Sequence, residues 1–173
     1  MNILFISGSA NTGKTETIYD LTKYLLSQAY NIKTTGIGEF LAPKQADIYK
    51  VTDFQCILEK KISNRITKNV LINSATDDKE CIDNFICFYK NNAYIDTVIT
   101  SIRGDETYDI DPERKYLISR IEELHKELGI EANIIEIPLG KITRRPKEKG
   151  LQWYKETTNK LIEFILKNPP FEL

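Results

Sequence analysis

The first 28 residues of the chain constrain its fold more than any other segment. An uninterrupted apolar run, Ile3 to Ile6, ends at Ser7 and Gly8, which is typical of a strand buried on both faces in a parallel sheet. From Lys14 to about Ser27, apolar residues recur at helical spacing, at Ile18, Leu21 and Leu25. A buried strand, a short glycine-containing turn and an amphipathic helix in direct succession predict an α/β protein.

The rest of the chain continues this alternation. We expect further strands at residues 31–35, 54–58, 70–72, 97–102 and 133–137. Helices are expected from an Asp77-Asp78 cap to about Lys90, from Asp111-Pro112 to Gly129, and over residues 151–165. The polar segment between residues 58 and 70 fits either a hairpin or an irregular link, and residues 36–52 are expected to be loop, with or without a short helix. This order predicts one domain over residues 1–173, with a three-layer α/β/α fold and a mostly parallel sheet.

The composition excludes several classes of protein. Hydrophobic residues make up 41% of the chain and charged residues 28%, which excludes a disordered or low-complexity chain. Lys and Arg number 24 against 25 Asp and Glu, so no overall positive field favours a nucleic-acid partner. The opening apolar run is too short for a signal peptide or a membrane span, and the three cysteines are expected to be reduced thiols. We therefore expect a cytoplasmic protein with no membrane contact, and the oligomeric state stays open.

The turn between the first strand and the first helix has a composition suited to phosphate. It fits the pattern G-x-x-x-x-G-K-[ST] at every fixed position, and its residues are Gly8, Ser9, Ala10, Asn11, Thr12, Gly13, Lys14 and Thr15. The two glycines let the backbone point successive amides at phosphate oxygens, and the helix start adds its positive dipole end. Lys14 is then expected to contact the β- and γ-phosphates of a nucleotide, and the Thr15 hydroxyl to ligate a bridging magnesium ion.

This strand, loop and helix resemble those of the P-loop nucleoside triphosphatases, over roughly the first 28 residues. The resemblance implies a nucleoside triphosphate bound with Mg²⁺, with Lys14 acting in catalysis and Thr15 as the metal ligand. Over the remaining chain, only the alternating plan of strands and helices is shared. Guanine-selective members usually carry an Asn-Lys-x-Asp motif, which does not occur here, so the resemblance favours ATP.

A second resemblance involves the same loop. Residues Asn11 to Glu16 are similar to the flavodoxin loop whose hydroxyls and amides hold the phosphate of flavin mononucleotide. Flavodoxin-like loops generally lack a lysine, because neutral donors suffice for a phosphate monoester, whereas Lys14 followed by Thr15 suits a metal-bound triphosphate. A flavodoxin-like, FMN-binding protein is therefore the alternative, and a yellow purified protein would indicate it.

A phosphoryl-transfer site also needs an acid that holds the magnesium through its water shell. Asp77 and Asp78 follow the expected strand at 70–72 and are candidates to orient the metal or the nucleophile, although both residues also suit a helix cap. Glu59, after the strand at 54–58 and with Asp53 behind it, is the second candidate. Asp105, after the strand at 97–102, is the third. The sequence leaves the choice open.

Two charged loops are expected at the carboxyl ends of strands, where such a fold has its ligand crevice. The first begins at Arg103, which is a candidate to stabilise a developing phosphoryl charge. The second, from Lys141 to Lys149, contains five basic residues and one acid. Within it, Arg144 and Arg145 are candidates to close over the transferred phosphate or to contact the base. Each loop is also consistent with a solvated surface.

Together these features predict binding of ATP or another nucleoside triphosphate with magnesium, and phosphoryl transfer to a small acceptor or to water. A small-molecule kinase is favoured, because one short domain leaves little room for partner modules. The alternative is a non-catalytic nucleotide-binding switch whose segment 141–149 docks a partner. His125, far in sequence from the loop, is assigned no role.

Overall fold

The computed structural model describes residues 1–9, 12–36, 52–92, 94–104, 111–140 and 148–173. Its elements are, in chain order, β1 (Asn2–Gly8), α1 (Lys14–Ser27), β2 (Asn31–Thr35), β3 (Gln55–Lys61), β4 (Thr67–Asn73), α2 (Lys79–Lys90), β5 (Thr97–Arg103), α3 (Pro112–Leu128), β6 (Asn133–Pro138) and α4 (Glu148–Lys167). Every strand and helix expected from the sequence is present, within a few residues of its expected bounds. Among the described residues, no helix combines the length and the apolar character needed to cross a membrane.

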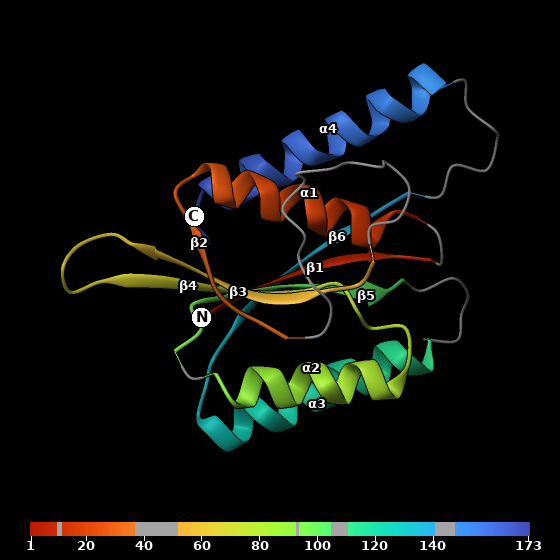
Figure 1. Ribbon diagram of the computed structural model, residues 1–173. Helices are drawn as coiled ribbons and strands as arrows, with labels where there is room; N and C mark the ends of the chain where they lie inside the picture. Colours follow the sequence, from red (N-terminus) through yellow and green to blue (C-terminus); the bar gives the residue numbers. More distant parts are fainter. Residues whose placement is uncertain (10–11, 37–51, 93, 105–110, 141–147) are drawn as a thin grey trace.

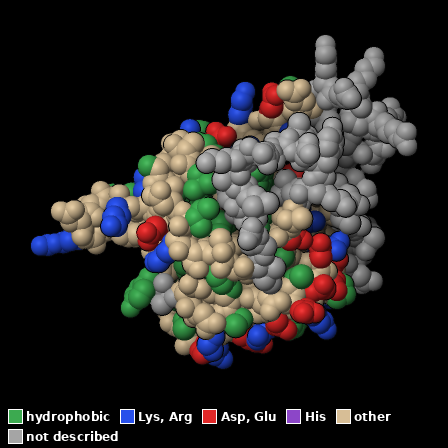
Figure 2. Space-filling model, viewed as in Figure 1, with side chains coloured by type: hydrophobic (Ala, Val, Ile, Leu, Met, Phe, Trp, Pro, Cys, Tyr) green, Lys and Arg blue, Asp and Glu red, His purple; other side chains and the backbone are tan. Residues whose placement is uncertain are grey.

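The strands form one mixed sheet in the order β2-β3-β4-β5-β1-β6. Four of them, β4, β5, β1 and β6, are parallel neighbours, which confirms a mostly parallel sheet. β3 runs antiparallel to both β2 and β4. It is antiparallel to β4 because the two strands are joined by a tight turn, closed by the Ile62 amide donating to the Ile66 carbonyl at 2.9 Å. The segment between residues 58 and 70 is therefore a hairpin, and it extends from the body of the molecule (Figures 1 and 2).

Helices cover both faces of the sheet, as Figure 1 shows. α1 and α4 pack on one face, where the α1 residues Ile18, Leu21 and Leu25 are buried as their spacing predicted. α2 and α3 pack on the other face and form a second apolar cluster with the sheet. β1 contributes to both, because its successive side chains point to opposite faces. The opening apolar run is thus a central strand buried on both sides.

The chain connections diverge on either side of β1. After β1, helix α1 packs on one face and the chain proceeds to β2 at one edge of the sheet. After β5, the neighbour of β1, helix α3 packs on the opposite face and the chain crosses to β6. In open α/β sheets, ligands generally bind at the carboxyl ends of strands where the connections diverge in this way. Gly8 and Arg103, the last residues of β1 and β5, are register partners at this point.

Candidate functional site

Glycines allow three backbone segments to approach closely at the carboxyl end of β1. Gly13, just before α1, has φ 84°, a left-handed conformation that other residues rarely adopt. A Cβ on Gly8 would meet the Thr12 side chain and lie 3.3 Å from the carbonyl oxygen of Leu139. A Cβ on Gly104, just after β5, would lie 3.1 Å from the Cα of Gly8. The turn is therefore pressed against the ends of both neighbouring strands.

The ammonium group of Lys14 lies inside this turn. Its Nζ donates to the carbonyl oxygens of Gly8 and Ser9, each at 3.0 Å, and the residue is only 8% exposed. The same Ser9 carbonyl accepts from the Thr12 hydroxyl at 2.9 Å. The N-cap residue, Gly13, has no side chain that could accept from the first amides of α1. A buried cation and the positive end of a helix therefore meet at one place, which favours an anion.

The next residue, Thr15, is paired with an acid. Its Oγ1 donates to Oδ1 of Asp53 at 2.8 Å, and the Ser74 hydroxyl donates to the same oxygen at 3.2 Å. Asp53 lies just before β3, and because β3 is antiparallel its start lies at the edge where β4, β5 and β1 end. Because β3 runs in this direction, Glu59 lies towards the opposite end of the strands. There its carboxylate forms an ion pair with Lys33 at 3.8 Å. The acid beside the turn is thus Asp53, which the sequence offered only as a residue behind Glu59.

The two aspartates favoured from the sequence have other partners. Asp78 is the N-cap of α2, and its Oδ1 accepts from the amide of Cys81 at 2.8 Å. That hydrogen bond lowers the pKa of Asp78 below its ordinary value. Asp77 forms an ion pair with Nη2 of Arg103 at 3.1 Å, and its side chain is 62% exposed. Asp78 therefore caps the helix, whereas Asp77 joins the start of α2 to the end of β5.

Buried polar side chains hold the segment between β4 and α2 in place. Asn73 Nδ2 donates to the Thr100 hydroxyl at 2.9 Å. Ser101 Oγ donates to the Ser74 carbonyl oxygen at 2.7 Å and lies 2.7 Å from the hydroxyl oxygen of Thr76. All five residues are buried. The backbone that carries the ion pair of Asp77 is therefore anchored on β5.

Arg114, in the first turn of α3, anchors the opposite side of the site. Its Nη1 donates to the carbonyl oxygen of Arg103 at 2.9 Å, and its guanidinium makes two hydrogen bonds to Glu136 of β6, at 2.9 and 2.7 Å. The guanidinium lowers the pKa of Glu136 below its ordinary value. These bonds tie the end of β5 to both α3 and β6, so the backbone of Arg103 is held from two sides.

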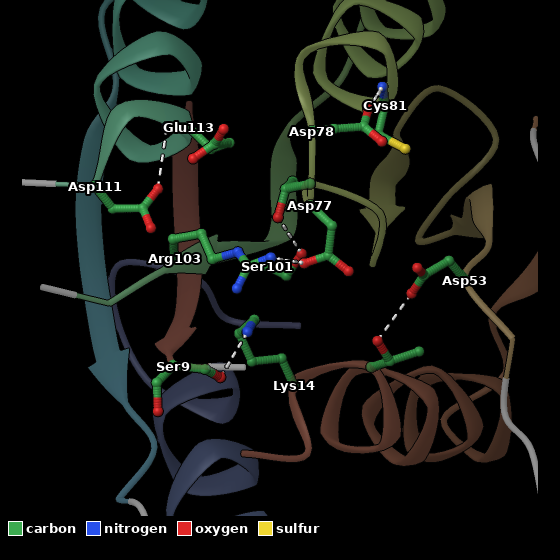
Figure 3. Close-up of polar contacts among 12 residues, drawn as sticks. Ser9, Lys14, Asp53, Asp77, Asp78, Cys81, Ser101, Arg103, Asp111 and Glu113 are labelled. Atoms are coloured by element: carbon green, nitrogen blue, oxygen red, sulfur yellow. Dashed lines mark hydrogen bonds and ion pairs between the residues drawn. The ribbon is translucent and has the colours of Figure 1, made fainter. Parts of the chain in front are cut away.

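Three carboxylates lie near the start of α2. Burial raises the pKa of the Cys81 thiol to about 11, and so do its hydrogen bond to Asp78 and the charges of Asp53 and Asp77. The three carboxylates are therefore close enough to act on one thiol at the start of α2, while the Lys14 ammonium lies in the turn after β1 (Figure 3). A neutral thiol is a poor nucleophile, so Cys81 is not suited to covalent catalysis.

Other candidates from the sequence lie elsewhere. Glu16 forms an ion pair with Lys155 of α4 at 2.9 Å, so its carboxylate is directed towards that helix. Ala10, Asn11, Asp105, Arg144 and Arg145 lie outside the described residues. The described site thus combines Gly8, Ser9, Thr12, Gly13, Lys14 and Thr15 with Asp53, Asp77 and Arg103.

No protein-family model, curated protein sequence or solved structure matches this chain significantly. The residues of the site are therefore the basis for assigning a function.

Proposed function

We propose that the chain binds a nucleoside triphosphate with Mg²⁺, preferably ATP, and transfers the terminal phosphoryl group to a small acceptor or to water. The central observation is that two consecutive residues have complementary surroundings. The Lys14 ammonium lies within a turn bounded by glycines, and the Thr15 hydroxyl is bonded to a carboxylate. A triphosphate requires a cation for its oxygens, and its magnesium requires hard oxygen ligands.

The turn and the start of α1 would bind the phosphate groups. Lys14 now donates to two neutral carbonyl oxygens, and phosphate oxygens are stronger acceptors for an ammonium. The lysine can exchange these partners without leaving the turn, because both carbonyls belong to the residues that open it. The amides at the start of α1 add neutral donors along the helix dipole.

Thr15 and Asp53 have the chemistry to hold Mg²⁺. Magnesium takes oxygen ligands, keeps several waters, and is usually bound by one or two protein groups together with substrate phosphates. Within the described ranges, no three His, Cys, Asp or Glu residues are arranged as a metal site. Thr15 and Asp53 would supply one direct oxygen and one oxygen that acts directly or through water. When bound, the ion would neutralise charge on the β- and γ-phosphates.

Arg103 and Asp77 are placed to act on the transferred group. Arg103 ends the strand next to β1, so its guanidinium provides a second positive charge near the turn. A phosphate group would compete with Asp77 for this guanidinium. Asp77 is exposed enough to contact an acceptor, and once released it can accept a proton from an attacking hydroxyl. If Asp77 stayed paired with Arg103 throughout, the same site would act as a nucleotide-binding switch.

Calorimetry with ATP tests the proposal, in the presence and absence of magnesium. Lys14→Ala is expected to weaken Mg·ATP binding by about 100-fold, because it removes charge-assisted hydrogen bonds to phosphate. Lys23→Ala is the matched control: Lys23 is an exposed lysine of the same helix, paired with Asp20 at 3.8 Å. The Lys23→Ala variant should bind Mg·ATP with the same affinity as the unmodified protein.

Equal affinity of Lys14→Ala and the unmodified protein would refute the phosphate site. A yellow protein that contains bound flavin would replace it with the FMN alternative. Turnover measured against nucleosides, sugars and small acids then separates an enzyme from a switch, because only the enzyme produces ADP.

A further inference from the structure

The end of the β3–β4 hairpin is a two-stranded arm that extends from the sheet. β2 accompanies β3 only as far as Glu59, and β5 accompanies β4 only from Val70. The backbone of residues 60–68, here called the arm, therefore pairs only with itself. Two side chains at the base of the arm also contact the body of the molecule: Lys60 lies over the Tyr30 ring at 5.1 Å, and Lys68 donates to the carbonyl oxygen of Glu172. The arm lies where β3 ends and β4 begins, at the end of the sheet opposite the candidate site. Figure 1 shows that it projects beyond the helices.

All charged residues of the arm are positive. They are Lys60, Lys61, Arg65 and Lys68, with no acid among residues 60–68, although the whole chain has a net charge of -1. Lys60 and Lys68 are direct cross-strand partners, an arrangement that is unfavourable for like charges. Lys61 and Arg65 form no ion pair within the part of the chain that the structure describes. Figure 2 shows Lys and Arg side chains on the projecting arm.

Two isoleucines are exposed at the end of the arm. Ile62 and Ile66 are 51% and 56% exposed, and they are bonded across the turn through their backbones. Because side chains alternate along a strand, both lie on the same face as Lys60 and Lys68. Lysines on a projecting strand pair can be explained as protection against aggregation. Exposed β-branched apolar residues oppose that purpose, so the tip offers a partner both positive charge and apolar surface.

We propose that the arm docks the protein on an anionic lipid bilayer, which departs from the expectation of no membrane contact that followed from the short opening apolar run. The two isoleucines enter the boundary between headgroups and acyl chains, and the cations contact lipid phosphates. A nucleic acid would neutralise the cations but leave both isoleucines in water, and the arm has no aromatic residue to stack on bases.

The position and charge of the arm also determine how the protein would be oriented on the bilayer. Since the arm is positive and the chain as a whole has a net charge of -1, the rest of the chain has a net negative charge that anionic lipid repels, and the arm is the part of the described structure that we expect to make contact. The carboxyl ends of β1 and β5 then face away from the bilayer, which leaves the candidate site open to solutes.

Vesicle co-sedimentation of the full chain tests this inference. We expect binding to phosphatidylcholine vesicles that contain about 30 mol% phosphatidylserine, none to phosphatidylcholine alone, and weaker binding at high salt. The double substitution Ile62→Ser and Ile66→Ser should weaken binding at least tenfold, and so should Lys61→Glu with Arg65→Glu. Ile134→Ser is the matched control, because Ile134 is 55% exposed on β6 at the far edge of the sheet.

Four results would overturn the inference. The first is no binding to anionic vesicles, and the second is binding that persists in the double isoleucine variant. The third is binding to duplex DNA or RNA, measured by anisotropy, that exceeds vesicle binding at equal salt and survives the isoleucine substitutions. A polarity-sensitive dye on Ser63→Cys, in a Cys87→Ser background, gives a readout that does not depend on the isoleucine variants folding. Its emission should shift to the blue only with anionic vesicles, and no shift would also refute insertion.

Discussion

Removal of the Thr15 hydroxyl is the most direct test of the proposed magnesium site. Thr15→Val keeps the shape of the side chain and deletes the 2.8 Å hydrogen bond to Asp53. A hydrogen bond to a charged group contributes about 1.5–3 kcal/mol. Because Thr15 is partly exposed and Ser74 still donates to the same carboxylate oxygen, we expect the lower end, about 1.5–2 kcal/mol of unfolding free energy.

A double-mutant cycle with Asp53→Asn separates this structural effect from metal binding. In urea denaturation without ligand, the double variant should be little less stable than either single variant, because both lose the same contact. In calorimetry, Mg²⁺ should strengthen ATP binding to the unmodified protein. In each single variant, the factor by which Mg²⁺ strengthens ATP binding should be at least about tenfold smaller. A tenfold change corresponds to about 1.4 kcal/mol of binding free energy.

Ser74→Ala is the matched control for the cycle. It removes the other hydrogen bond to Asp53 Oδ1, at 3.2 Å, without altering a residue of the turn. It should lower stability and retain the enhancement by Mg²⁺. If Thr15→Val keeps the full enhancement, Thr15 is not a metal ligand. If affinity falls equally with and without Mg²⁺, the pair with Asp53 only shapes the turn.

Three further substitutions probe the packing around the site and the pH dependence of the fold. Gly104→Ala should weaken ATP binding in calorimetry, because its Cβ would lie 3.1 Å from the Cα of Gly8 and displace the turn. Gly129→Ala is the control, because Gly129 has a left-handed backbone and open space around it. It should cost about 1 kcal/mol of unfolding free energy, seen as a lower melting temperature, and leave the affinity for ATP unchanged. Equal affinities of the two variants for ATP would contradict the close approach of Gly104 to Gly8. His125 is buried with Nε2 3.0 Å from the Tyr89 hydroxyl, and burial lowers its pKa below the ordinary 6.5. The unfolded chain then takes up a proton that the folded chain excludes, so stability is lost as pH falls below about 6.5. His125→Gln should show a smaller loss of unfolding free energy between about pH 7.5 and pH 5, and identical profiles would show that His125 does not contribute.

The beginning of the fold was predictable because several independent signals agree there. The apolar run of β1 indicates burial on both faces, the glycines indicate an unusual turn, and the spacing in α1 indicates one buried face. The caps of α2 and α3 were predictable for the same reason, since Asp78 and Asp111 precede apolar residues at helical spacing and do accept from the first amides. Each of these signals is local, so it requires no knowledge of how the strands pair.

The acid beside Thr15 depends instead on the direction of a strand. In a parallel sheet, an acid that reaches the site is expected directly after an apolar run, because the carboxyl ends of parallel strands lie at the same end of the sheet. Asp53 precedes its strand and is 38 residues from Thr15, and it reaches that edge only because β3 is antiparallel. A signal for this reversal does exist in the sequence. A parallel crossover needs about a dozen residues or more between its strands. The polar segment from Glu59 to Asn69 is too short for one once the strands extend into it, so the hairpin and the position of Asp53 follow together.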